Sequence, residues 1–281
     1  MASPLRPPAA SQFDVVRLLD TATVSVRDVC CRGECRHRSD EECIGATQLV
    51  FPYRGTYLRH VGQTQAVADA NHVLLFNAGE GYQVSHPVEG GDANFVLQLA
   101  DALLDELAPA PLRRKGAAVA FRHQALRIDA RTQALVALLG HALRRGTCEP
   151  LEAEGLALTL ASRSLGARTA HVPGATRGRQ RLVDRAKLLL ASDPGRRWTL
   201  AEIADEIGGS PVYLTQVFRQ VEGLPLYRYQ LQLRLARALD LLATAEDVST
   251  VAHDLGFSSH SHFASAFRQA YGRSPSTFRA S

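Results

Sequence analysis

Residues 198–278 read WTLAEIADEIGGSPVYLTQVFRQVEGLPLYRYQLQLRLARALDLLATAEDVSTVAHDLGFSSHSHFASAFRQAYGRSPSTF, and this segment contains one pattern twice. IADEIGGS at residues 203–210 is echoed by VAHDLGFS at residues 251–258, and FRQ at residues 218–220 returns at residues 267–269. Two copies are too few for a solenoid. They indicate a pair of matched modules in one chain.

Each copy predicts a helix, a Gly-containing turn and a second helix. In the first copy Thr199 can cap the first helix, and Ser210 can cap the second, with Pro211 at its first position. Gly208 and Gly209 lie between them and permit a tight turn. Apolar residues recur at helical spacing in all four helices. This is the helix-turn-helix arrangement, whose second helix enters the major groove of DNA.

A long helix is predicted between the two copies, from residue 225 to about residue 242. At 1.5 Å per residue its roughly 18 residues span about 27 Å. One turn of DNA is about 34 Å, so a rigid spacer of this order can hold two recognition helices in successive major-groove segments. A generic helical bundle is the alternative, and the repetition and the spacer both disfavour it.

The residues that lead to a known family are GFSSHSHFASAFRQAYGRSPSTFR, at residues 256–279. They contain a Gly-Phe turn, a Ser-x-x-Phe start, a second Phe four residues on, Gly-x-Ser-Pro and an aromatic-Arg end. With these features the chain resembles the DNA-binding domain of the AraC family of bacterial transcription regulators, strongly over about residues 179–279 and weakly upstream. The resemblance implies a C-terminal all-α domain with two helix-turn-helix modules joined by a long helix, and double-stranded operator DNA as the partner.

The resemblance also assigns DNA-facing positions on each second helix. On the first they are Val212, Tyr213, Thr215, Gln216 and Arg219. On the second they are His260, Ser261, His262, Ser265 and Arg268. Gln216 can pair with adenine, Val212 and Thr215 can meet thymine methyl groups, and Arg219 is expected at a phosphate. Relatives carry longer polar residues at Ala264 and Ser265, so the second module is expected to read fewer bases.

Composition fits a regulator that works inside the cell. No apolar run approaches the ~20 residues that span a bilayer, and no signal-peptide core is present, so we expect a cytoplasmic protein without a membrane partner. From Arg177 onward the chain has 14 Arg or Lys against 10 Asp or Glu, whereas the first 176 residues have 18 of each. The positive excess therefore lies in the part predicted to bind DNA, as phosphate neutralisation requires.

Short β-like runs separated by Gly, Asp and Pro turns precede the helical part, and they predict a small barrel or sandwich. They lie at residues 23–30, 47–53, 56–61, 71–77, 82–88 and 93–99, after a short alternating or helical piece at Phe13–Asp20. The resemblance implies a cupin-like barrel that binds an effector. Residues 71–87 are similar to its segment in which a Gly turn precedes a pocket-lining His, here His86.

The predicted fold class is therefore α+β. Two amphipathic helices at residues 129–145 and 151–165 follow the strands, and they either pack on the barrel alone or also form a dimer seam. The predicted organisation is a disordered tail (1–12), a cupin-like sensor domain (13–110), the helical pair (111–165), a linker (166–181) and the tandem helix-turn-helix domain (182–281).

Four of the five cysteines lie in VCCRGECRHRSDEEC, at residues 29–43. In an intracellular protein such a cluster is more often metal-binding or redox-reactive than a disulfide framework, and thiolates suit zinc or another soft ion. On a straight strand the Cα atoms of Cys31 and Cys35 would be ~13 Å apart, so Gly33 must turn the chain for them to share an ion. The candidate ligands are Cys31 and Cys35 first, then Cys30, His37, Cys43 and His86.

No C-x-x-C pair is present, so an oxidant-sensing thiol and inert cysteines stay open beside a metal site. The function predicted is a sequence-specific DNA-binding transcription regulator whose N-terminal domain senses a metal ion, an oxidant or an organic ligand. The competing class is an enzyme fused to a DNA-binding domain, either a cysteine-dependent alkyl-transfer protein or a cupin oxygenase. Enzyme motifs such as G-x-S-x-G, H-E-x-x-H and a P-loop are missing from the sequence, so a non-enzyme is expected. Further expected partners are an effector, a second copy of the chain in a homodimer, and RNA polymerase if the protein activates.

Overall fold

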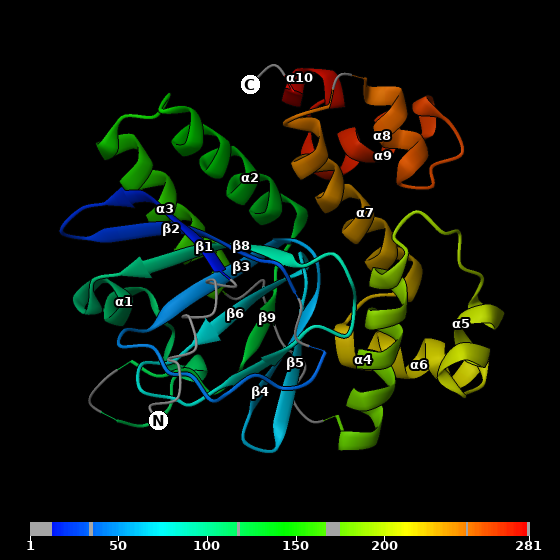
Figure 1. The fold of residues 1–281 in the computed structure, drawn as a ribbon, viewed down its shortest axis with the longest axis horizontal. Coiled ribbons are helices and arrows are strands. Elements are labelled where there is room, and N and C mark those ends of the chain that lie inside the picture. The colour runs from blue at the N-terminus through cyan, green and yellow to red at the C-terminus, as the bar shows by residue number, and fades with distance from the viewer. Residues whose placement is uncertain (1–12, 34–35, 117–118, 167–174, 246, 280–281) are drawn as a thin grey trace, which may run out of the picture.

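The strands lie in the first half of the chain, between Phe13 and Arg127, and the second half is mainly helical (Figure 1). The computed structural model describes residues 13–33, 36–116, 119–166, 175–245 and 247–279. The predicted tail at residues 1–12 and Cys35 lie outside these ranges. The α+β class predicted from the sequence is confirmed.

Two antiparallel sheets build the first half, and apolar side chains of both meet between them. One sheet has the order β1-β2-β8-β3-β6-β9 and the other β5-β4-β7. The strands are β1 (Phe13–Asp20), β2 (Val24–Cys31), β3 (Gln48–Arg54), β4 (Tyr57–Val61), β5 (Thr64–Ala68), β6 (His72–Phe76), β7 (Gln83–Ser85), β8 (Asp92–Leu99) and β9 (Ala125–Arg127). Each of the six predicted runs contains a strand. The short strands β5 and β9 were not predicted, and Phe13–Asp20 is a strand. The cupin-like character of this region stays a prediction.

Strand β2 separates the two environments of the larger sheet, because successive side chains of a strand point to opposite faces. Val24 and Val26 are buried in the core beneath the helices. Arg27, Val29 and Cys31 point the other way and line a cavity between the sheets. The same alternation therefore sends the neighbours Cys30 and Cys31 to different faces.

Helices α1 (Asp101–Leu107), α2 (Ala130–Arg145) and α3 (Pro150–Leu165) follow the strands, with a 3₁₀ turn at Ala110–Leu112. Asp129 caps α2 by accepting from the Thr132 amide, and Gly146 ends it with φ +65°. Both helices of the predicted pair bury their apolar stripes in one core with the sheet, as Leu139 and Leu160 show. The two helices thus pack on the strands, and their additional role as a dimer seam stays a prediction.

The C-terminal half consists of α4 (Arg177–Ser192), α5 (Leu200–Ile207), α6 (Pro211–Glu222), α7 (Leu226–Leu242), α8 (Val248–Asp254), α9 (His260–Tyr271) and α10 (Pro275–Arg279). Helix α4 begins inside the segment predicted as a linker, because the Thr176 side chain caps it there. Helices α4 to α6 and the start of α7 share one apolar core, and the rest of α7 shares a second core with α8 to α10. The two modules and the helix that joins them are thus as predicted. No helix of the described ranges is long and apolar enough to cross a bilayer.

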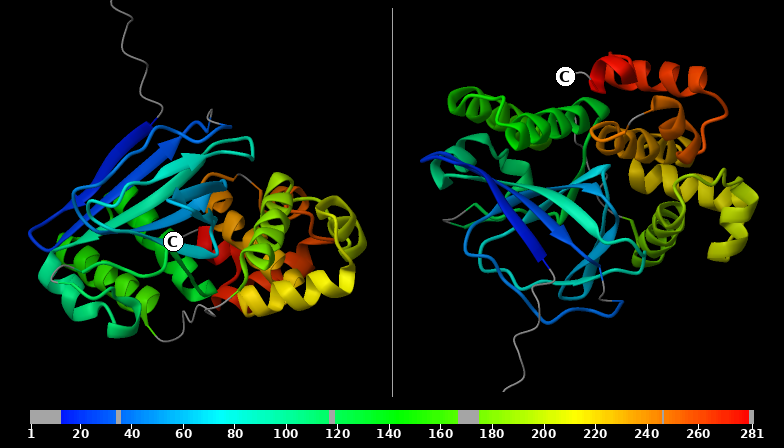
Figure 2. Two further views of the ribbon diagram at one scale, coloured as in Figure 1. Left: turned by 90° about the horizontal axis from the view of Figure 1, so that it is seen from below. Right: turned by 45° about the horizontal axis from the view of Figure 1, so that its top comes forward.

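The helical half meets the N-terminal half at several places, which include contacts of α7 with β3 and α2 (Figure 2). The second module packs on α2, where the Tyr271 hydroxyl donates to Gln133 at 3.4 Å and the rings of His141 and Phe278 lie 6.0 Å apart. The first module is joined to β5 and β6 by a group of buried polar and charged side chains, which we call the junction cluster. Its members are Asp69, His72, Lys187, Glu222 and Tyr229.

The charged side chains of the junction cluster pair with one another. Lys187 of α4 forms an ion pair with Glu222 at the end of α6. The His72 ring lies between two carboxylates, with Nδ1 2.8 Å from Asp69 and Nε2 3.3 Å from Glu222. Burial raises the pKa of Glu222, but Lys187 and His72 outweigh it and hold that pKa well below its ordinary value. The pair therefore stabilises the folded chain down to strongly acidic pH.

Removing one member of this pair should be far more harmful than removing a surface ion pair. We expect Lys187→Ala to lower the free energy of unfolding by about 3–5 kcal/mol, because Glu222 would be left charged and buried. Unfolding in urea can be followed by the fluorescence of Trp198, the single tryptophan of the chain, which packs against the first module.

The matched control is Arg17→Ala, which removes the exposed Arg17–Asp20 pair and should cost less than about 1 kcal/mol. The double variant Lys187→Met with Glu222→Met should recover much of the loss, since it leaves no unpaired charge. Equal effects of Lys187→Ala and Arg17→Ala would contradict this account of the junction cluster.

Candidate nucleic-acid interface and cavity cluster

Helix α6 is held so that one face is free of the core. Thr199 and Glu202 form a capping box at the start of α5, and Gly208 ends α5 with φ +69°. Ser210 then caps α6 by accepting from the Tyr213 amide. Both caps were predicted from the sequence and are confirmed. Leu214 and Phe218 are fully buried, which turns the other side of the helix outward.

The five positions predicted to face DNA on α6 are all exposed. They are Val212, Tyr213, Thr215, Gln216 and Arg219. Val212 and Tyr213 are 68% and 48% exposed. The Thr215 hydroxyl donates to the Pro211 carbonyl at 2.9 Å, so the methyl group is the part of Thr215 best suited to an apolar contact.

Helix α9 presents its outer face in the same way. Ser259 caps it by accepting from the His262 amide, and Phe263 and Phe267 are fully buried. The predicted positions His260, Ser261, His262, Ser265 and Arg268 are exposed. The His262 ring is fixed by a 3.0 Å hydrogen bond between Nδ1 and the Ser258 hydroxyl, and it packs on Phe257.

The turn of the second module touches the loop before α5. Gly256 has φ +73°, and a Cβ atom there would collide with the Gly195 carbonyl. Arg197 donates from Nε to the Gly256 carbonyl at 2.9 Å. Only glycine allows this close approach, which ties the two modules together beside α7.

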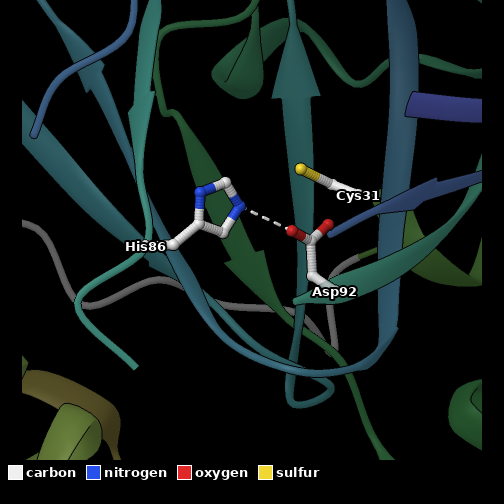
Figure 3. A group of neighbouring side chains, drawn as sticks. All are labelled: Cys31, His86 and Asp92. Carbon is white, nitrogen blue, oxygen red and sulfur yellow. Dashed lines mark hydrogen bonds and ion pairs between the residues drawn. The ribbon is translucent and has the colours of Figure 1, made fainter. Parts of the chain in front are cut away.

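A different group of reactive side chains lies in the cavity between the sheets, at Cys31, His86 and Asp92 (Figure 3). We call it the cavity cluster. Cys31 ends β2 and Asp92 begins β8, and the two residues are direct partners in the antiparallel ladder. Directly opposed side chains have Cβ atoms about 5 Å apart. His86 follows the last residue of β7 and reaches in from the facing sheet.

Two glycines let these segments approach each other. Gly33 and Gly91 both have positive φ, +71° and +67°. A Cβ atom on Gly33 would meet the Gly91 backbone at 2.6 Å, and one on Gly91 would collide with the Cys31 carbonyl. This close approach packs the end of β2 against the loop between His86 and Asp92. The expected return of Cys35 toward Cys31 lies outside the described residues.

Hydrogen bonds orient the cavity cluster. His86 Nε2 lies 2.7 Å from Asp92 Oδ2, and Asn94 donates to the other oxygen of Asp92. The Tyr57 hydroxyl donates to Asn94 at 3.4 Å. Burial lowers the pKa of His86, but the hydrogen bonds and charges of Asp92 and Cys31 outweigh burial and raise it to about 10.

The other predicted metal ligands are not brought to this point. Cys30 lies on the opposite face of β2, with Sγ 3.6 Å from Arg54, and burial followed by the charge of Asp28 raises the pKa of its thiol. His37 and Cys43 are exposed, and Cys35 lies outside the described residues. Of the five predicted ligands that lie in the described ranges, the structure therefore brings together Cys31 and His86. Asp92 was missed because only the pairing register of β2 and β8 reveals it.

The comparisons with known proteins concern mainly the helical half. Residues 203–281 match the family model described as a helix-turn-helix domain. The Msm operon regulatory protein of Streptococcus mutans is 32% identical over 98 residues, which cover 34% of this chain and 35% of that protein. The transcriptional activator RhaR of Klebsiella pneumoniae is 33% identical over 108 residues, 38% of each chain. The chain thus aligns with a little over a third of the length of these relatives.

A wider but weaker match extends upstream. An AraC-like transcription regulator of Streptomyces antibioticus is 26% identical over 211 residues, covering 73% of this chain and 66% of that protein. Among solved structures, ToxT of Vibrio cholerae O395 covers 96% of this chain and 98% of its own, at 14% identity and a TM-score of 0.36. A TM-score of this size does not establish a shared fold.

Two capped modules with exposed second helices, joined by one long helix, define a tandem helix-turn-helix protein. Together with the matched relatives, this identifies the C-terminal part of the chain as a helix-turn-helix domain similar to those of AraC-type transcription regulators.

The raised pKa of His86 can be tested by titration. A pKa of about 10 in the folded chain, above the ordinary 6.5, means that the protonated ring stabilises the fold fully below pH 6.5. This contribution is lost as the pH rises through about 10. We expect Asp92→Asn to shift the pKa of His86 toward or below 6.5, because burial lowers this pKa and the charge of Asp92 no longer raises it. Ring-proton NMR of the metal-free protein measures both values.

The internal control is His141, whose pKa burial and the nearby Arg144 lower to about 4. It should titrate alike in both proteins. A His86 ring that titrates near 6.5 before the substitution would contradict the described pairing with Asp92.

Proposed function

We propose that this protein is a sequence-specific DNA-binding transcription regulator whose N-terminal half senses a signal. The observation that carries the proposal is the pair of capped modules with outward-facing second helices, α6 and α9. The relatives that match this half are named as regulators of transcription. The whole protein would read DNA with its helical half and receive the signal with its strands.

Both modules would contact one stretch of operator DNA. Helix α7 has 17 residues and is about 25 Å long. This length suits two recognition helices in successive major-groove segments. Gln216 would read adenine, and Arg219 would neutralise phosphate. The smaller outward residues of α9, with Ser265 beside Ala264, would leave it with fewer base contacts and more backbone contacts.

The cavity between the sheets would hold the signal. Its volume is about 280 Å³, and apolar residues make up much of its lining. A metal ion or an oxidant acting at Cys31 would be one class of signal, and an organic ligand with unreactive cysteines would be the other. The junction cluster would pass the change to α6, because Glu222 ends that helix. A homodimer through α2 and α3, and contact with RNA polymerase in an activator, complete the proposal.

An enzymatic role is less well supported. A Cys-His-Asp catalytic relay needs one ring nitrogen at the nucleophile and the other at the carboxylate. In the cavity cluster it is Nε2 that meets Asp92, and within the described part of the chain Nδ1 of His86 has no hydrogen-bond partner. The geometry therefore lacks the arrangement of a Cys-His-Asp relay.

The DNA contacts can be tested on an operator selected from random sequence with the purified protein. Gln216→Ala should lose about 1–3 kcal/mol of discrimination at one base pair, because a bidentate base contact disappears. Arg219→Ala should instead weaken binding to all sequences and reduce the salt dependence of binding by about one unit. Quantitative gel-shift titration at several salt concentrations separates the two effects.

Arg131→Ala on α2 serves as the control, since it removes an exposed arginine outside both modules. Base preference and affinity unchanged by both α6 substitutions would refute the assignment of α6 as a recognition helix. Failure of the unmodified protein to select any sequence would refute the proposed function itself.

A further inference from the structure

We propose that Cys31, His86 and Asp92 form a binding site for one divalent cation of the zinc class, with its open coordination position facing the cavity between the sheets. That the ion acts as a signal for DNA binding rests on the proposed function. The binding of the ion does not.

The first argument is convergence. One sulfur, one ring nitrogen and one carboxylate oxygen lie within 4.8 Å of one another. Zinc binds such donors at about 2.0–2.3 Å, which places tetrahedral ligands roughly 3.3–3.7 Å apart. Side-chain rotations that move the donors by about an ångström would therefore close the site. In the described ranges, these three residues are the one group of His, Cys, Asp and Glu side chains with this arrangement.

The second argument is the choice of donor atoms. A thiolate and an imidazole select zinc and related borderline-soft ions, while a carboxylate alone would favour harder ions such as magnesium. The Cys31 thiolate and the Asp92 carboxylate would also balance the two charges of the ion. Since Cys31, His86 and Asp92 are only 9%, 4% and 4% exposed, a neutral site avoids the high cost of an unpaired buried charge.

The third argument is the support around the donors. Metal-binding carboxylates are usually held by further hydrogen bonds. Here Asn94 holds the Asp92 oxygen that does not face His86, and Tyr57 holds Asn94. The Gly33 amide donates to Cys31 Sγ at 3.4 Å, which orients the sulfur.

The three protein donors leave room for a fourth ligand. Tetrahedral zinc sites with three protein ligands keep one position for water or a small molecule. Cys31, His86 and Asp92 are part of the cavity wall, which also includes Val29, Val50 and Val96. Water or a small ligand in the cavity could reach the ion there, so the site is of the open type and differs from a closed structural zinc site.

The test uses the full-length chain, stripped of metal by chelation and titrated with Co²⁺ as a spectroscopic probe. We expect one Co²⁺ per chain and a thiolate-to-cobalt charge-transfer band, with displacement of Co²⁺ by Zn²⁺. Cys31→Ser should abolish the band. Asp92→Asn and His86→Gln should keep the band but weaken Co²⁺ binding by more than about 10–100-fold, which is the loss caused by removing a residue that only supports a ligand.

Cys30→Ser is the matched control, because Cys30 is the next residue of β2 and faces away from the cavity. It should leave the band and the affinity unchanged. The proposal is overturned if the unmodified chain binds no Co²⁺, if the band survives in Cys31→Ser, or if Cys30→Ser loses it. If circular dichroism shows that Cys31→Ser does not fold, the affinities of Asp92→Asn and His86→Gln decide.

Gel-shift binding to the selected operator is measured on the same samples. If the unmodified chain binds its operator normally but binds no Co²⁺, this inference is refuted and the proposed function is not. Metal binding as expected without any operator binding would refute the proposed regulator and leave the metal site intact.

Discussion

Tyr229 makes the contact on which the relation between the two halves depends. Its ring lies in the core of the first module, 5.2 Å from the Phe218 ring of α6, and it is fully buried. Its hydroxyl donates to Asp69 at the end of β5, and its backbone carbonyl accepts from Asn71 at 3.3 Å. A buried phenol and a buried carboxylate are costly without partners, so the first module cannot separate from the strands without losing these bonds. A movement of the strands that displaces Asp69 would therefore also displace Tyr229, and with it Phe218 of α6.

Helix α7 carries this constraint from one module to the other. Its first turns belong to the core of the first module and its last turns to the core of the second. Both recognition helices therefore pack against the same helix, α7. The contact between Gly195 and Gly256 is a second link between the two modules. The modules differ in how they meet the N-terminal half. Charged side chains hold the first, and mainly apolar contacts with α2 hold the second.

The features that were predictable from the sequence are those fixed by neighbouring residues. The caps at Thr199 and Ser210, the glycine turns and the apolar stripes of the repeat all act within a few residues, so the helical half could be derived. The alternation of β2 could also have separated Cys30 from Cys31, since adjacent strand residues face opposite sides.

What could not be derived depends on pairing across the chain. Asp92 joins Cys31 through the register of two strands 60 residues apart in sequence, which no local pattern reveals. The junction cluster likewise joins Asp69 and His72 to Glu222, and a buried Lys187 reads from sequence as an ordinary exposed lysine of α4. Strands β5 and β9 were missed as well.

The central claim is that α6 and α9 engage DNA together as parts of one rigid unit. Hydroxyl-radical footprinting of the full-length protein on its selected operator tests it most directly. The account predicts two protected segments on the same face of the duplex, with centres about one helical turn, or roughly 10–11 base pairs, apart. A single protected segment, or two segments on opposite faces of the duplex, would contradict it.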